Sequence, residues 1–133
     1  MMFMLDTNTV SYLLKNQYPV IKDHLNKIPI DSVCISVITE AELLRGVQKK
    51  PEAINLAKLV KAFLIRTTIC TWDSTAAQEY ANFRTACESE GKSLSAMDML
   101  IASHSLATEA TLVTNDKAFY QMKHLLQLED WTK

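Results

Sequence analysis

Four acidic residues stand at positions where a carboxylate can take part in chemistry. Asp6 directly follows the apolar run MMFML, and Asp116 comes two residues after the run TLVT. Glu42 and Asp98 lie in segments with helical spacing of apolar residues. Carboxylates brought together by folding repel one another unless a cation neutralises them, and Mg²⁺ and Mn²⁺ prefer oxygen ligands. The four acids therefore indicate a candidate metal site that could activate water and stabilise charge on a phosphate.

Each of these acids also has an ordinary structural explanation. Asp6 and Asp116 stand where helix N-caps stand, and Asp98 falls in a first helical turn, where a negative charge is favourable. Glu42 could pair with a basic residue one turn further on. Glu40 lies in the same helix, about 200° away from Glu42, so only one of the two can face a shared pocket. Spacing alone leaves that choice open.

Strands and helices alternate along the chain and would position these residues. Runs rich in β-branched residues predict strands at 2–5, 33–36, 66–70 and 110–114, with a last edge strand at 125–129. Apolar spacing predicts helices at 7–15, 19–27, 37–48, 53–65, 75–90, 96–108 and 117–123, with Ser74 and Ser95 as caps of the fifth and sixth. The alternation predicts an α/β fold, a three-layer α/β/α domain with a small, mostly parallel sheet. Strand ends meet at one edge of such a sheet, which could gather the four acids.

Length and composition fit one domain covering residues 1–133. The chain is 48% hydrophobic, enough for a core, and its formal net charge is −1. This balance gives no global attraction to nucleic acid, so any binding of RNA needs a local basic patch. Arg45, Lys49 and Lys50, followed by Lys58 and Lys61, are either a solvated face or a set of phosphate contacts.

The cysteines and histidines exclude other kinds of site. Three cysteines without a CxxC pattern argue against a disulfide scaffold or a zinc site and favour a reducing, cytoplasmic setting. No apolar run is long enough to cross a membrane. His104 recurs with apolar residues at helical spacing, which favours a packing role, whereas His24 and His124 have the polar surroundings of surface residues. The chain has no pattern of paired catalytic histidines or of a serine nucleophile.

Several motifs in order resemble the PIN domain, and specifically the VapC toxins of bacterial toxin–antitoxin pairs. They are MLDTN (4–8), SVITEAELLRG (36–46), SAMDMLIASHSLA (95–107), LVTND (112–116) and the terminal LEDWTK. The resemblance covers nearly the whole chain. Its second motif, AEL followed shortly by glycine, selects Glu42 over Glu40. Many relatives carry Gly or Pro in the stretch before Asp98, where this chain reads SLSAM (93–97).

The resemblance implies an endoribonuclease dependent on Mg²⁺ or Mn²⁺. Asp6, Glu42 and Asp98 would be the principal metal ligands, directly or through water, and Asp116 a fourth acid acting through water. Thr7, Asn8 and Thr114 would support the pocket by hydrogen bonding. Attack of water on phosphorus would leave a 5′-phosphate and a 3′-hydroxyl without using the RNA 2′-hydroxyl.

The resemblance also implies a substrate and partners. The substrate would be RNA of the translation machinery, most similar to the subgroup that cleaves initiator tRNA in the anticodon region. The partners would be a VapB-type antitoxin and a second copy of the chain in a homodimer. Apolar residues on 53–65 exceed what one small sheet needs, which fits a groove for a partner.

Two other functions fit parts of the pattern. A phosphotransferase with Asp6 as nucleophile would need a second acid where the chain has Asn8. A PIN-like scaffold could bind RNA or protein without cutting it, although all four acids are present. Metal-dependent cleavage separates the nuclease from both alternatives.

Overall fold

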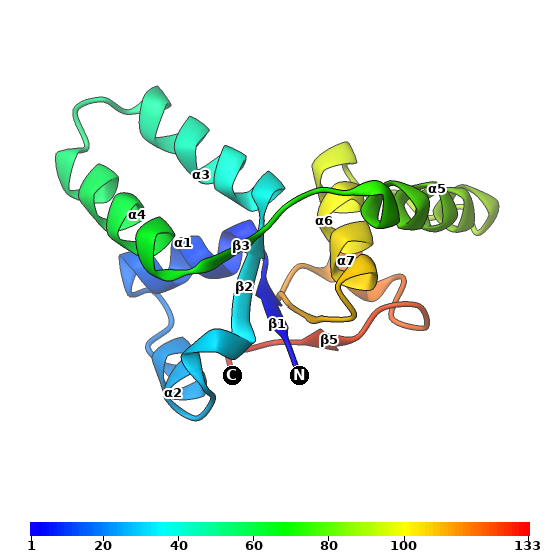
Figure 1. The fold of residues 1–133 in the computed structure, drawn as a ribbon, viewed down its shortest axis with the longest axis horizontal. Helices are drawn as coiled ribbons and strands as arrows, with labels where there is room; N and C mark the ends of the chain where they lie inside the picture. Colours follow the sequence, from blue (N-terminus) through cyan, green and yellow to red (C-terminus); the bar gives the residue numbers. More distant parts are fainter.

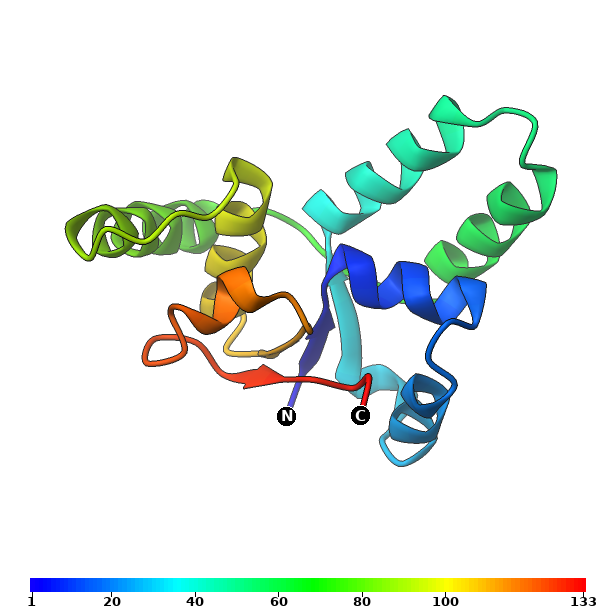
Figure 2. The same ribbon diagram turned by 180° about the vertical axis from the view of Figure 1, so that it is seen from behind.

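The computed structural model describes residues 1–133 and contains one five-stranded sheet with helices on both faces (Figures 1 and 2). The strands are β1 (Phe3–Leu5), β2 (Val33–Ser36), β3 (Thr68–Cys70), β4 (Thr111–Val113) and β5 (Leu128–Glu129). Their order is β3-β2-β1-β4-β5, and every pairing is parallel. The predicted three-layer α/β/α fold is therefore confirmed, and the sheet is wholly parallel.

The helices divide between the two faces of the sheet. One layer holds α1 (Thr7–Lys15), α2 (Val20–Asn26), α3 (Val37–Lys49) and α4 (Ile54–Arg66), with a short 3-10 helix (Ile30–Ser32) before β2. The other holds α5 (Ser74–Ser89), α6 (Ala96–Ala107) and α7 (Lys117–Tyr120). In Figure 1 the first group lies to the left of the central strands and the second to the right. No helix is both long and apolar enough to cross a membrane.

The alternating side chains of the central strand β1 pack into two separate cores. Phe3 and Leu5 of β1 pack into a buried cluster with Val10 of α1, on the face covered by α1 to α4. Met4, between them, points to the other face and packs in a cluster with Phe83 of α5. Successive side chains of a strand point to opposite faces, so both layers are anchored to β1. This anchoring holds the end of β1, and the residue after it, in a fixed place.

Several element boundaries differ from the sequence prediction. Helix α5 begins at Ser74 rather than after it, because Asp73 is the N-cap and its carboxylate accepts from the Ala76 N–H at 2.9 Å. Helix α4 runs on to Arg66, which shortens β3. The last helix and the last strand are also shorter than predicted.

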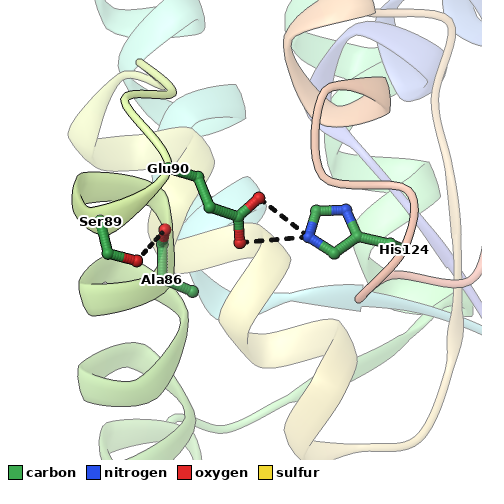
Figure 3. A network of polar contacts seen from close by, with 4 residues as sticks. All are labelled: Ala86, Ser89, Glu90 and His124. Carbon is green, nitrogen blue, oxygen red and sulfur yellow. Dashed lines mark hydrogen bonds and ion pairs between the residues drawn. The ribbon is translucent and has the colours of Figure 1, made fainter.

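A surface contact joins the end of α5 to the segment after α7. Nε2 of His124 lies 3.0 and 3.2 Å from the two carboxylate oxygens of Glu90, and Ser89 donates to the Ala86 carbonyl (Figure 3). His124 is exposed, as the sequence predicts.

Candidate active site

The strand order creates a switch point between β1 and β4. The chain builds outward from β1 to β2 and β3, then returns to add β4 on the other side of β1. β1 leads into α1 on one face, and β4 leads into α7 on the other. The crevice left at the carboxyl ends of two such strands is where open parallel sheets bind ligands. Asp6 follows β1 directly and Thr114 follows β4 directly, so both stand at this crevice.

Asp6 is a helix cap and a pocket residue at once. Its Oδ1 accepts from the Thr9 N–H at 2.8 Å, which caps α1, and the residue is 3% exposed. The cap uses only one of the two carboxylate oxygens, so Asp6 can cap α1 and still offer an oxygen to a metal ion. Burial raises the pKa of Asp6, hydrogen bonds with Thr114 and Thr9 oppose the rise, and the negative charge of Asp116 adds to it.

Glu42 is held from across the crevice by the first residue of α1. The Thr7 hydroxyl donates to Glu42 Oε1 at 2.5 Å and lies 3.3 Å from the Thr39 hydroxyl. Glu40 instead lines a separate apolar hollow with Leu44 on the outer side of α3 and α4. The helical rotation between the two glutamates thus places Glu42, and not Glu40, beside the residues that follow β1.

Asp98 reaches the same site from α6. Its backbone N–H donates to the Oγ of Ser95, the N-cap that the sequence predicts. Burial raises the pKa of Asp98 most, and the charges of Asp116, Glu42 and Asp6 raise it further, against a hydrogen bond with Ser95. Asp98 therefore lies within electrostatic reach of the other three acids.

Asp116 is also a helix cap, at the start of α7. Its Oδ1 accepts from the Ala118 N–H at 2.9 Å, and its own N–H donates to the Thr114 hydroxyl oxygen at 3.0 Å. Tyr120 donates to the Thr114 carbonyl at 2.9 Å. Thr114 is fully buried, so this network fixes the turn that carries Asp116 toward Asp6.

The donor set fits a hard divalent cation in type and in charge. The only ion pairs in the structure are Arg84–Glu88 and His124–Glu90, so no lysine or arginine neutralises any of the four acids. All candidate ligands are oxygen atoms, as Mg²⁺ and Mn²⁺ prefer. No three acid, histidine or cysteine side chains converge closely enough to hold an ion by themselves. Water would complete the ligand set, as is usual for Mg²⁺.

Comparison with known proteins places this arrangement in a family. The PIN domain model matches residues 3–125. Ribonuclease VapC2 of Rickettsia felis is 37% identical over 139 residues, covering 100% of both chains. The chain belongs to the PIN domain family, among its VapC ribonucleases. The tRNA(fMet)-specific endonuclease VapC of Salmonella typhimurium is 33% identical over 131 residues, 97% of each chain. The crystal structure of VapBC2 from Rickettsia felis bound to a promoter DNA fragment matches with TM-score 0.87 and 32% identity, over 98% of this chain and 99% of that one.

The predicted basic residues of this PIN domain lie at two neighbouring hollows. Lys49 and Lys50 line a cavity together with Thr7 and Glu42, and Arg45 lines an adjacent one that shares Glu42 and Lys49. The basic residues thus stand beside the acidic site on α3. Asn8 is exposed and its side chain makes no hydrogen bond, unlike the support expected of it.

Two further features of the PIN domain escaped the sequence interpretation. Lys15 and Ser11 line the same cavity as Thr7, spaced four residues apart on one face of α1, and this spacing could have identified them. Ser36 and His104 pair at 2.7 Å between β2 and α6, a contact between residues 68 apart that no local pattern reveals.

Proposed function

We propose that this chain is an endoribonuclease that needs Mg²⁺ or Mn²⁺ and cuts tRNA. The observation that carries the proposal is that the charges of Asp116, Glu42 and Asp6 all act on Asp98, while no ion pair neutralises any of the four acids. Carboxylates that repel one another and have no basic partner are stabilised by a bound cation. The names of the relatives at 33% and 30% identity, tRNA(fMet)-specific endonucleases, support tRNA as substrate, with initiator tRNA as the first candidate.

The side chains of the crevice have separate roles in this proposal. Asp6, Glu42 and Asp98 would hold the cation, and Asp116 would act on it through water. When bound, the cation activates water toward a phosphodiester and offsets charge that develops on the phosphate. Thr7 orients Glu42 through its hydroxyl, and Thr114 holds the turn of Asp116 by accepting from its N–H.

Histidine chemistry has no place in this mechanism. Nε2 of His104 lies 3.1 Å from the Thr71 carbonyl and Nδ1 lies 2.7 Å from the Ser36 hydroxyl, so both ring nitrogens are occupied. A cut made without a base that activates the 2′-hydroxyl leaves a 5′-phosphate and a 3′-hydroxyl. These ends are the expected product.

A VapB-type antitoxin is the proposed partner, and the outer surface of α3 and α4 is the proposed surface that binds it. Large apolar side chains are exposed there, among them Leu44 at 48%, Ile54 at 64% and Ile65 at 75%. Such a surface favours burial against another chain. The similarity to solved VapBC structures from Rickettsia felis, Haemophilus influenzae and Salmonella typhimurium supports this partner. A homodimer belongs to the same proposal.

Cleavage of total tRNA by the purified chain tests the proposal. We expect discrete cuts with Mg²⁺ or Mn²⁺, none with EDTA, and none with Asp6→Asn, which keeps the helix cap and removes the charge. Sequencing of the ends identifies the tRNA and the cut position. A folded, metal-loaded protein that leaves every tRNA intact would support the non-cleaving scaffold instead. A 2′,3′-cyclic phosphate end would contradict the hydrolytic route.

A further inference from the structure

A cavity of about 200 Å³ opens between α1, α3 and α4, directly beside Glu42. Its polar wall carries Thr7 and Ser11, both from α1. Leu14, Leu56 and Val60 give it an apolar lining. The volume is below the roughly 300–1,000 Å³ of pockets for drug-sized ligands, so a flat group the size of one nucleobase suits it.

Positive charge surrounds this cavity. Lys15 comes from α1, and Lys49 and Lys50 come from the end of α3. None of the three forms an ion pair, and Glu42 is the only acid of the lining. An apolar interior beside unpaired lysines matches a base joined to a phosphate, and Glu42 stands where this cavity meets the candidate catalytic site.

Gly46 joins this cavity to its neighbour. It lines both cavities, the second with Arg45 and Met97. A Cβ at Gly46 would meet nothing within 4 Å, and no positive φ demands glycine there. Glycine within a helix is unfavourable compared with alanine. Neither packing nor backbone conformation requires glycine here, and the space around its Cα is open between the two cavities, so a large side chain at this position would obstruct them.

We propose that this cavity binds one unpaired nucleotide of the RNA substrate, next to the phosphate that is cut. The inference rests on the proposed ribonuclease function and adds to it where the neighbouring nucleotide lies. The base lies against Leu14 and Leu56, the phosphate lies at Lys49 and Lys15, and the RNA strand crosses α3 over Gly46. A base held in a duplex cannot enter such a cavity, so the site selects loops and single strands.

Binding without cleavage tests this inference. Fluorescence polarisation of a labelled, non-self-complementary RNA hexamer in EDTA gives the Kd, so no result depends on turnover. Gly46→Phe fills the space between the two cavities, and Gly46→Ala is its matched control. We expect Gly46→Ala to bind as the parent does and Gly46→Phe to bind at least about tenfold more weakly, as for the loss of one buried ring. The same hexamer annealed to its complement should bind more weakly than the single strand.

The salt dependence of binding gives a second measurement on the same site. For a single strand, removing one lysine that binds a phosphate lowers the slope of log Kd against log salt by about 0.7. Lys49→Gln should show this drop. Lys58→Gln should not, because Lys58 lies on α4 and lines neither cavity. Circular dichroism confirms that each variant is folded.

The outcomes distinguish a failure of this inference from a failure of the proposed ribonuclease function. Equal binding by Gly46→Phe and Gly46→Ala, equal slopes for Lys49→Gln and Lys58→Gln, or equal affinity for single strand and duplex would each overturn the inference, whether or not the chain cuts tRNA. The expected binding pattern in a protein that never cuts tRNA would instead leave the nucleotide site standing and overturn the proposed function.

Discussion

The Ser36 hydroxyl donates a hydrogen bond of 2.7 Å to Nδ1 of the buried His104. The direction follows from the far side of the ring, where Nε2 faces the Thr71 carbonyl and must carry the proton, because a carbonyl only accepts. Ser36 also caps α3, whose next turns carry Glu42, and His104 belongs to α6, which carries Asp98. This bond therefore ties two of the candidate metal-binding elements together.

Replacing His104 should change how stability depends on pH. Burial lowers the pKa of His104, against a hydrogen bond with the Thr71 carbonyl and the charge of Asp73, which raise it. The unfolded chain then takes up a proton before the folded one does. Stability is therefore fully present above the ordinary histidine pKa and is lost as pH falls through the folded value.

Denaturant unfolding at steps from about pH 8 to about pH 5 measures this effect. His104→Gln should cost about 1–3 kcal/mol at neutral pH because its hydrogen bonds are removed, and the variant should lose less stability on acidification than the parent. His124→Gln, at an exposed site, is the control. An unchanged pH dependence of stability in His104→Gln would contradict a lowered pKa of His104 in the fold.

Asparagine and alanine at position 6 should separate the cap from the charge. Asn caps a helix as well as Asp does, whereas Ala loses about 1 kcal/mol. Because the pKa of Asp6 is raised in the fold, its ionised form opposes folding. We expect metal-free Asp6→Asn to melt above the parent at neutral pH, with the gap closing as pH falls through the folded pKa toward the ordinary value of 3.8. Asp6→Ala should melt below Asp6→Asn at every pH.

Addition of Mg²⁺ provides the matching control for position 6. A cation that binds only the folded state raises the melting temperature of the parent. The rise should be smaller in Asp6→Asn. A parent that melts above Asp6→Asn without metal at neutral pH would show that burial of this charge is not costly.

Thr7→Val should lower activity more than stability. The substitution keeps the shape of the side chain and removes the donor to Glu42. A hydrogen bond to a charged group contributes about 1.5–3 kcal/mol, so kcat should fall by about ten- to a hundredfold if the bond orients Glu42 during reaction. Thr7→Ser keeps the hydroxyl and should retain most activity. Similar losses in both variants would argue that Thr7 acts by packing.

Asp116→Asn should be the mildest of the changes to the four acids. The amide oxygen still caps α7, so the turn after β4 should remain in place. The charge of Asp116 acts on Asp6 and Asp98 from across the crevice. We expect a smaller loss of cleavage than for Asp98→Asn, measured on one tRNA at one Mn²⁺ concentration. A complete loss with intact folding would make Asp116 a principal ligand.

Local patterns were sufficient to predict most of the fold. Alternation in FML and the apolar spacing of the helices depend on neighbours in sequence, so the layers and most boundaries follow from them. Asp73 was missed because both Asp73 and Ser74 are good caps, and only the observed hydrogen bond decides between them.

The candidate site was predictable only in part. The position of each acid at the end of a strand or the start of a helix is local and visible. The cavity beside Glu42 depends on how α1, α3 and α4 pack, which spacing does not determine. The place of Gly46 at this cavity and the bond between Ser36 and His104 therefore emerge only in three dimensions.

Binding of Mn²⁺ is the most direct test of the claim that the four acids form one metal site. Electron paramagnetic resonance of free Mn²⁺, titrated with the protein, reports binding without any substrate. The parent should remove Mn²⁺ from solution at a defined stoichiometry, and Asp98→Asn, which removes the carboxylate whose pKa responds to the other three acids, should leave much more of it free. Equal binding by the parent and by Asp98→Asn and Asp6→Asn would place the metal elsewhere and contradict the account.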